Sequence, residues 1–265
     1  MTDLNFKFGT LIRTGPKLKS GGKWDATLED EVRNAGTNAD LTISIKVNFV
    51  KINPSSGRAG TYNDTDSRPR KIQRWASGEF EHYTSNLLRS AQKYWNGVFW
   101  LRTPNAYAGL DWPDAKPTHR CNVYCRLDLA LAENATDGHY TIAAVRVRDD
   151  EVFRSNSVLY SQKDIQSESM IPHSTVKFWT HFHEVGHLLG LGHIGWAGNH
   201  NLHSNNSPRA YGVTRKDQID VMGMGSVRRH WHALPWQQAA AVFTETKPTD
   251  WTVHMHHVLP KPIPC

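Results

Sequence analysis

The chain has 265 residues, of which 38% are hydrophobic and ten are tryptophan. This composition excludes a chain that is disordered throughout, and the length is sufficient for a folded domain with its own hydrophobic core. The net charge of +6 favours acidic partners, but the basic residues are scattered along the sequence, so a nucleic-acid partner is not expected.

The sequence also bears on localisation. Residues 1–24 contain no apolar run that would serve as the core of a signal peptide, and no stretch of about 18 apolar residues occurs anywhere. We therefore expect no membrane span and no conventional export signal. The chain is expected to be synthesised in the cytoplasm, with secretion by a signal-independent route as a hypothesis.

The first predicted elements are an irregular segment, a strand and a helix. Residues 1–40 are rich in Gly, Lys, Asp and Asn and predict an irregular N-terminal extension. Residues 41–50 alternate apolar and polar side chains, which is typical of a half-buried strand. Apolar residues then recur at helical spacing over 77–95 and predict an amphipathic helix that ends at Gly97.

Strands dominate the middle of the chain, and helices follow. The segments predicted as strands are 98–102, 121–131, 140–147 and 157–161. Ser174 is a possible N-cap for a helix over 175–189, and Pro235 marks the first turn of a final helix over 234–244. Strands and helices in this order predict an α+β fold.

The three cysteines, Cys121, Cys125 and Cys265, are too few for a disulfide scaffold. In an extended strand, Cys121 and Cys125 would lie roughly 13 Å apart, which is too far for a direct bridge. Either cysteine can pair with Cys265, or all three are free thiols.

The segment from His183 to His193 reads HEVGHLLGLGH and carries the strongest signal in the sequence. On a helix, His183 and His187 lie one turn apart on the same face, where two imidazoles can bind one ion. Glu184 supplies a carboxylate next to this face, as a general base requires.

A glycine and a third histidine complete the pattern. Gly190 can adopt the positive φ that ends a helix and turns the chain, which allows His193 to return as a third ligand. Three protein ligands leave a fourth position for water, as in catalytic zinc sites. Two histidines and a glutamate can also share a helix for packing alone, but this alternative does not account for the glycine and the third histidine. All five fixed positions together predict one Zn²⁺ ion. Other divalent ions also accept these ligands.

This segment resembles the signature HExxHxxGxxH of the metzincin metallopeptidases, which also have a methionine turn beneath the metal. Here the turn corresponds to DVMGMG, with Met222 preferred and Met224 as the alternative; a pair of methionines that only fill a gap is the other interpretation. The resemblance implies a twisted mixed β-sheet with two long helices, above a mostly irregular C-terminal subdomain that carries one helix.

The resemblance also implies the domain organisation. Residues 41–265 would form a single catalytic domain, with an upper subdomain over about 41–192 and a lower subdomain over about 193–265. Two positions depart from the familiar subfamilies: Ile194 follows the third histidine, and Met224 stands where some subfamilies have a tyrosine that approaches the metal. Tyr211 is a possible replacement for that tyrosine.

Other polar residues near the motif are expected to lie outside the set of metal ligands. His181 lies on a different helix face from His183, which favours a packing or surface position. His200 and His203 are expected at the surface, with a position that lines the cleft as the alternative. Asp220 precedes the methionine turn and can accept hydrogen bonds from turn amides or from a ligand histidine.

The predicted function is a zinc-dependent endopeptidase with His183, His187 and His193 as ligands and Glu184 as general base. Its partners would be a protein or peptide substrate and an acidic partner or inhibitor, and a monomer is favoured. Because an unrestrained cytosolic protease would be harmful, a secreted bacterial effector or toxin of narrow specificity is a hypothesis. The alternatives are a zinc hydrolase of a non-protein amide such as peptidoglycan, and a non-catalytic zinc-containing binding module.

Overall fold

The structure is a computed structural model, and it describes residues 11–14, 24–29, 39–107, 109–110, 122–194 and 208–255. The helices in this part of the chain are α1 (Glu79–Trp95), α2 (Thr180–Leu188), α4 (Arg215–Gln218) and α5 (Leu234–Thr244). The strands of the main sheet are β1 (Leu11–Thr14), β2 (Asp25–Glu29), β3 (Ala39–Ile52), β4 (Ala59–Asn63), β5 (Pro69–Gln73), β6 (Phe99–Arg102), β7 (Asn122–Leu131), β8 (Tyr140–Val147), β9 (Leu159–Ser161) and β12 (Thr252–Met255). A separate two-stranded sheet pairs β10 (Ser167–Glu168) with β11 (Phe178–Trp179). Short 3-10 turns occur at η1 (Ala135–Asp137), η2 (Gln162–Ile165), η3 (Pro208–Tyr211), η4 (His230–Ala233) and η5 (Pro248–Asp250).

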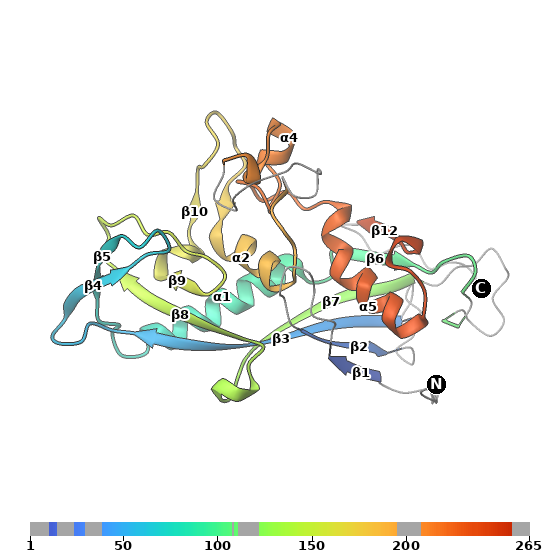
Figure 1. Cartoon of the computed structure of the whole chain (residues 1–265), viewed down its shortest axis with the longest axis horizontal. Coiled ribbons are helices and arrows are strands. Elements are labelled where there is room, and N and C mark those ends of the chain that lie inside the picture. The colour runs from blue at the N-terminus through green and yellow to red at the C-terminus, as the bar shows by residue number, and fades with distance from the viewer. Residues whose placement is uncertain are drawn as a thin grey trace.

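The long strand β3 is the centre of the main sheet (Figure 1). One edge of β3 pairs with β7 in parallel, and the other edge pairs with β2 over its first half and with β8 over its second half. The sheet is mixed, because β2 runs antiparallel to β3 whereas β7 and β8 run parallel to it.

The chain crosses β3 between β7 and β8, although only a short turn connects these two strands. The crossing is fixed on both sides of β3: the N–H of Ala132 donates to the carbonyl of Val47, and the N–H of His139 donates to the carbonyl of Lys46. The His139 ring accepts a hydrogen bond from the Lys46 N–H at 2.9 Å. Consecutive strands therefore lie on opposite edges of β3 and do not form a hairpin.

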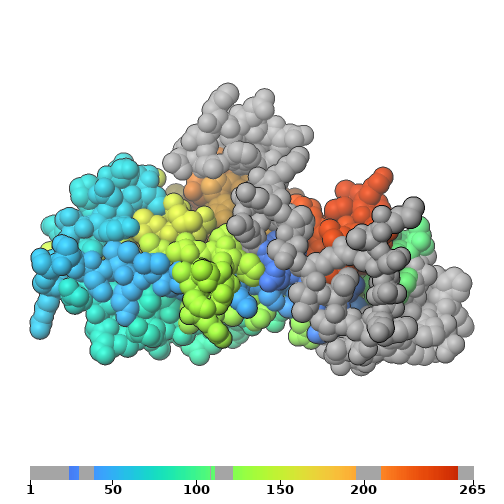
Figure 2. Space-filling view, turned by 60° about the horizontal axis from the view of Figure 1, so that its bottom comes forward, coloured from blue at the N-terminus to red at the C-terminus, as the bar shows by residue number. Residues whose placement is uncertain are grey.

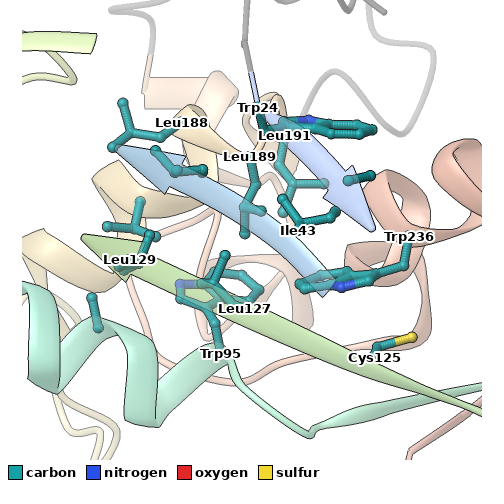
Figure 3. Close-up of a cluster of buried hydrophobic side chains, with 14 of the residues drawn as sticks. Trp24, Ile43, Trp95, Cys125, Leu127, Leu129, Leu188, Leu189, Leu191 and Trp236 are labelled. Atoms are coloured by element: carbon teal, nitrogen blue, oxygen red, sulfur yellow. The ribbon is translucent and has the colours of Figure 1, made fainter. Parts of the chain in front are cut away.

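The hydrophobic core lies on one face of the sheet. Leu41, Ile43, Ile45 and Val47 of β3 are fully buried, whereas the residues between them are partly or largely exposed, as the alternation of the sequence predicts. Side chains from α1, α2 and α5 join them in a single cluster. Figure 3 shows labelled members of this cluster, among them Trp95 of α1, Leu188 of α2 and Trp236 of α5, around the sheet.

The space-filling view shows how the described segments follow one another along the molecule. Residues of β4 and β5 gather at one end, in blue to cyan, and residues near the end of the described chain lie towards the other end, in red (Figure 2). The first part of the segment from His183 to His193 lies on α2, which is drawn above the central strands in Figure 1.

The expectation of an irregular extension over residues 1–40 is wrong for two described segments. Residues 25–29 form β2, which pairs with β3 in register from Asp25 opposite Ser44 to Glu29 opposite Asp40. The backbone of residues 11–14 forms β1 and pairs with β2. The side chains of Ala26 and Leu28 in β2 are buried. The pairing of β2 also covers the edge that the first half of β3 would otherwise leave without hydrogen-bond partners.

The helix expected over residues 175–189 also begins later than expected. Ser174 is not its N-cap: its Oγ accepts the Val176 N–H at 3.1 Å in a local turn, and α2 starts at Thr180. The preceding residues Phe178 and Trp179 are extended and pair with Glu168 and Ser167. Aromatic residues favour strands over helices, and this pairing prevents the earlier start.

The remaining expectations have mixed outcomes. The α+β class with a mixed sheet is confirmed, and so are the helices expected over 77–95 and 234–244, within two residues at each end. The expectation of two long helices is wrong, because α1 has 17 residues and α2 has nine. Among the residues that the structure describes, no helix has the length and apolar character needed to cross a bilayer.

Candidate metal centre

Helix α2 brings two histidines to one side, and the turn after it returns the third. α2 ends at Leu188, and Gly190 has φ +94°, in the left-handed region that favours glycine. The Gly190 N–H donates to the His187 carbonyl, and the Leu191 N–H donates to the Gly186 carbonyl, both at 2.9 Å. This tight C-terminal turn reverses the chain, so His193 lies beside His183 and His187.

The three imidazoles converge through the same ring atom. Their Nε2 atoms are separated by 3.1 Å from His183 to His187, 3.1 Å from His187 to His193, and 3.2 Å from His193 to His183. Tetrahedral zinc with Zn–N bonds of about 2.0–2.1 Å brings two nitrogen ligands about 3.3 Å apart. The triangle therefore has the size that a small divalent cation requires, and the three histidines can bind a metal ion.

Hydrogen bonds to the other ring nitrogens define the tautomers. His183 Nδ1 lies 2.7 Å from the Val221 carbonyl oxygen, and His187 Nδ1 lies 2.8 Å from the Leu191 carbonyl oxygen. A carbonyl only accepts, so both Nδ1 atoms carry the proton and both Nε2 atoms present lone pairs. Two lone pairs that face each other at 3.1 Å repel, and a cation between them removes this repulsion.

Burial keeps the cluster neutral. It lowers the pKa of His183 well below its usual value, with the neighbouring His187 and His193 as further causes. Burial also lowers the pKa of His187, and it lowers the pKa of His193 to about 3. Neutral imidazole is the form that binds a metal ion, so protons do not compete for these nitrogens near neutral pH.

Glu184 is buried next to this cluster. Its side chain is 6% exposed, and burial raises its pKa to about 8, with the carboxyl of Asp164 as a second cause. A divalent cation near the carboxyl would favour the ionised form and lower this pKa. Glu184 directly follows His183 in the chain and is therefore a candidate to exchange a proton with a molecule held at the three histidines.

Met222 lies directly beneath α2. A Cβ atom at Gly186 would lie 2.3 Å from the Met222 Sδ, so the absence of a side chain at Gly186 lets the methionine approach the helix. Met222 is fully buried, whereas Met224 is half-buried, which favours the first choice for the turn methionine. The turn also contacts the third ligand's segment, because the Ile194 N–H donates to the Met222 carbonyl at 3.1 Å.

Two aromatic rings lie beside the histidines. The ring centroid of Tyr211 is 4.3 Å from that of His193 and 5.8 Å from that of His183. Phe178 of β11 packs against His183 with centroids 5.4 Å apart. Tyr211 and Phe178 are half-buried and come from separate segments, so each keeps surface that a bound molecule can contact.

The other histidines, Asp220 and the cysteines considered in the sequence lie outside the group of three converging imidazoles or outside the described residues. His181 is a packing residue: it is buried, and its ring contacts the Asp164 carbonyl at 2.8 Å and the Ser90 hydroxyl at 3.0 Å. Asp220 accepts a hydrogen bond from the Met222 N–H of the turn at 2.8 Å, and His183 contacts the Val221 carbonyl instead of Asp220. Cys125 is a buried free thiol. His200, His203, Cys121 and Cys265 lie outside the described residues.

Sequence reasoning missed several contributors to the site. The carbonyls of Val221 and Leu191 hold two histidines, but a backbone oxygen leaves no residue-type signal. The sequence predicted Phe178 to lie in a helix. In the structure it lies in β11, which pairs with β10, and its ring packs against His183. Asp164 belongs to no recognisable sequence motif, and only the tertiary structure brings it near Glu184.

Comparisons with protein-family models, with curated proteins and with solved structures found no match to this chain. The likeness to metzincins is therefore one of motif and spacing. The function has to be inferred from the chain's own residues.

Proposed function

We propose that this protein is a zinc-dependent endopeptidase of metzincin type, with zinc bound by His183, His187 and His193. The observation that carries the proposal is the convergence of three Nε2 atoms within 3.1–3.2 Å of one another, with the buried Glu184 directly after His183 in the chain. A purely structural zinc site has no use for such a carboxyl. This favours a hydrolase over a binding module that retains zinc for stability.

The donor set fits zinc. Nitrogen ligands suit zinc better than magnesium or calcium, which prefer oxygen. When bound, zinc would supply a Lewis acid that polarises the scissile carbonyl and lowers the pKa of water. The carbonyls of Val221 and Leu191 keep two ligand rings in the tautomer that binds the ion.

Glu184 would act as the proton carrier. Its carboxylate would accept a proton from the attacking water and deliver it to the nitrogen of the leaving amine, so that the peptide bond breaks with a neutral leaving group. Because the side chain is almost completely buried, bulk water does not compete for the proton. Tyr211 and Phe178 flank the histidines and would contact the substrate on two sides.

The substrate would be a protein or peptide, and the net charge of +6 favours an acidic substrate or inhibitor. Restricted specificity agrees with delivery as a bacterial effector or toxin by a signal-independent route. A monomer is sufficient, because all four proposed site residues lie within one segment of a single chain.

Proteome cleavage tests the proposal. The purified protein is incubated with a cell extract, and new N-termini are identified by mass spectrometry. Glu184→Gln should reduce cleavage by about 10²–10⁴-fold, because the amide cannot accept the proton. Its zinc content should stay at one ion per chain, because the carboxyl is not a ligand.

Glu168→Gln is the matched control, since Glu168 is an exposed carboxylate of β10. It should cleave like the unchanged protein. Absence of new N-termini with zinc bound would contradict the peptidase. Release of fragments from purified peptidoglycan would then indicate a non-protein amide, and no reaction on either material would indicate a binding module.

A further inference from the structure

Asp220 is a fully buried carboxylate with three partners, and it stands at the start of the methionine turn. Its Oδ1 accepts the Met222 N–H at 2.8 Å and contacts His232 Nε2 at 3.0 Å. Its Oδ2 forms an ion pair with Arg229 Nε at 3.0 Å. Both carboxylate oxygens are therefore satisfied, as burial of a charge requires.

The protonation state of His232 follows from its contacts. The backbone N–H of Arg229 donates to His232 Nδ1 at 2.7 Å, so Nδ1 is unprotonated and Nε2 carries the hydrogen that is donated to Asp220. Burial lowers the pKa of His232, in agreement with a neutral ring. Asp220 and Arg229 thus form a balanced pair of opposite charges, and the neutral His232 is a fixed donor.

The turn that begins at Asp220 contacts one of the three histidines directly and the residue next to another. The Val221 carbonyl accepts from His183 Nδ1 at 2.7 Å. The Met222 carbonyl accepts the N–H of Ile194, the residue after His193, at 3.1 Å. The Met222 N–H belongs to the same planar peptide unit as the Val221 carbonyl, so the Asp220 carboxylate restricts the direction of that carbonyl directly, and that of the Met222 carbonyl through the adjoining residue.

The backbone closes this arrangement into a compact loop. The N–H groups of Gly223 and Gly225 both donate to the Asp220 carbonyl, at 2.9 and 3.1 Å. The Val221 N–H donates to the Val227 carbonyl at 3.0 Å. A displacement of Asp220 would therefore be transmitted to the whole turn and to His183.

We infer that Asp220, held by Arg229 and His232, is a positioning residue that sets the geometry of the metal ligands His183 and His193. The inference rests on the metal site of the proposed function and is independent of the reaction. Residues that orient metal ligands typically change metal affinity by about 10–100-fold when they are removed.

A purely structural role for the cluster would have a different signature. A buried ion pair that only joined two loops would, when removed, lower the stability of the fold and leave the metal geometry of the folded protein unchanged. Metal affinity and the absorption spectrum of bound Co²⁺ distinguish the two roles, because the Co²⁺ bands depend on the ligand arrangement.

The test compares the full-length protein with Asp220→Ala and Asp220→Asn. Zinc affinity is measured by competition with a chelator, and Co²⁺ spectra are recorded on the folded fraction. We expect Asp220→Ala to weaken zinc binding by about 10–100-fold and to shift the Co²⁺ bands. Asp220→Asn retains an oxygen that can accept the Met222 N–H and should recover part of the affinity.

Arg228→Ala is the matched control. Arg228 is next to Arg229, but its guanidinium lies over the Tyr94 ring, 4.5 Å from the centroid, and not on Asp220. It should bind zinc like the unchanged protein. If Asp220→Ala does not fold, Asp220→Asn and Arg229→Lys decide the matter, with a weaker affinity and shifted bands expected for both.

Two results would overturn parts of the account separately. Folded Asp220 and Arg229 variants with the affinity and spectrum of the unchanged protein would overturn the positioning role and leave the metal site intact. Failure of the unchanged protein to bind zinc or Co²⁺ would overturn the metal site, and the positioning role with it.

Discussion

The buried face of β3 and the buried surroundings of α2 are built from different side chains. Along β3, the alternate residues of 41–47 that face the core are aliphatic and fully buried. Around α2, the buried side chains include His183, Glu184, Asp164 and Asp220. The first region is held by contacts without direction, and the second by hydrogen bonds with defined partners.

This difference teaches what each region contributes. In the aliphatic region, a substitution changes buried volume and therefore the free energy of unfolding. In the polar region, a substitution leaves a specific donor or acceptor without its partner and changes the geometry or charge of the site. The two regions should therefore respond to mutation in different observables, and substitutions at three positions can break or sharpen that contrast.

The largest effect is expected in the aliphatic region. Ile43→Ala should lower the free energy of unfolding by about 2–5 kcal/mol, because it removes methyl groups from the fully buried cluster of Figure 3. Denaturant unfolding in the presence of a chelator measures this change. Ile43→Val should cost about 0.5–1.5 kcal/mol, and both folded variants should retain the zinc affinity of the unchanged protein. A large loss of zinc affinity in folded Ile43→Val would break the contrast.

A pH-dependent effect of a few kcal/mol is expected at Asp164 in the polar region. Burial raises the pKa of Asp164 from its ordinary value of 3.8 to about 7, against the opposing hydrogen bonds from Ser155 and Ser161. The folded protein therefore favours the protonated carboxyl. This contribution to stability is fully present below about pH 4 and is lost as pH rises through about 7.

The difference between the unchanged protein and Asp164→Asn isolates this group. We expect the unchanged protein to lose stability relative to the variant as pH rises from 4 to 7, because the amide does not ionise. Unfolding free energies measured across this range provide the check. A difference that does not change with pH would show that Asp164 is ionised in the folded protein throughout.

The smallest effect is expected where the two regions meet, at Gly186. An alanine Cβ would lie 2.3 Å from Met222 Sδ and 3.1 Å from Met222 Cε, so the methionine has to move. We expect crowding to cost about 1–3 kcal/mol, offset by up to about 1 kcal/mol from the higher helix propensity of alanine. Met222→Ala in the same chain should relieve the crowding. Equal costs of Gly186→Ala with and without Met222 would contradict the contact.

Long periodic segments of the fold were predictable from the sequence. β3 and α1 each repeat their apolar pattern over enough residues to define the element and its buried face. β2 was missed because five residues provide too few repeats, and its stability comes from its partner β3. The start of α2 was misplaced because Phe178 and Trp179 pair with residues about ten positions earlier, which local propensity does not report.

The convergence of His183, His187 and His193 was predictable because all three lie in one short segment, so spacing alone predicts their proximity. Their environment was not predictable in the same way. The carbonyl of Val221 lies 38 residues from His183, and Tyr211 reaches His193 from a separate turn. These contacts depend on how distant segments pack, and a sequence pattern carries no record of that.

The most direct test of the central claim is the zinc affinity of His193→Ala beside that of His181→Ala. Both histidines are buried, but only the Nε2 of His193 lies within 3.1–3.2 Å of the other two ligand atoms. We predict one zinc ion per chain in the unchanged protein and in His181→Ala, and an affinity lower by about tenfold or more in His193→Ala. Equal zinc affinity in all three proteins would contradict the metal centre.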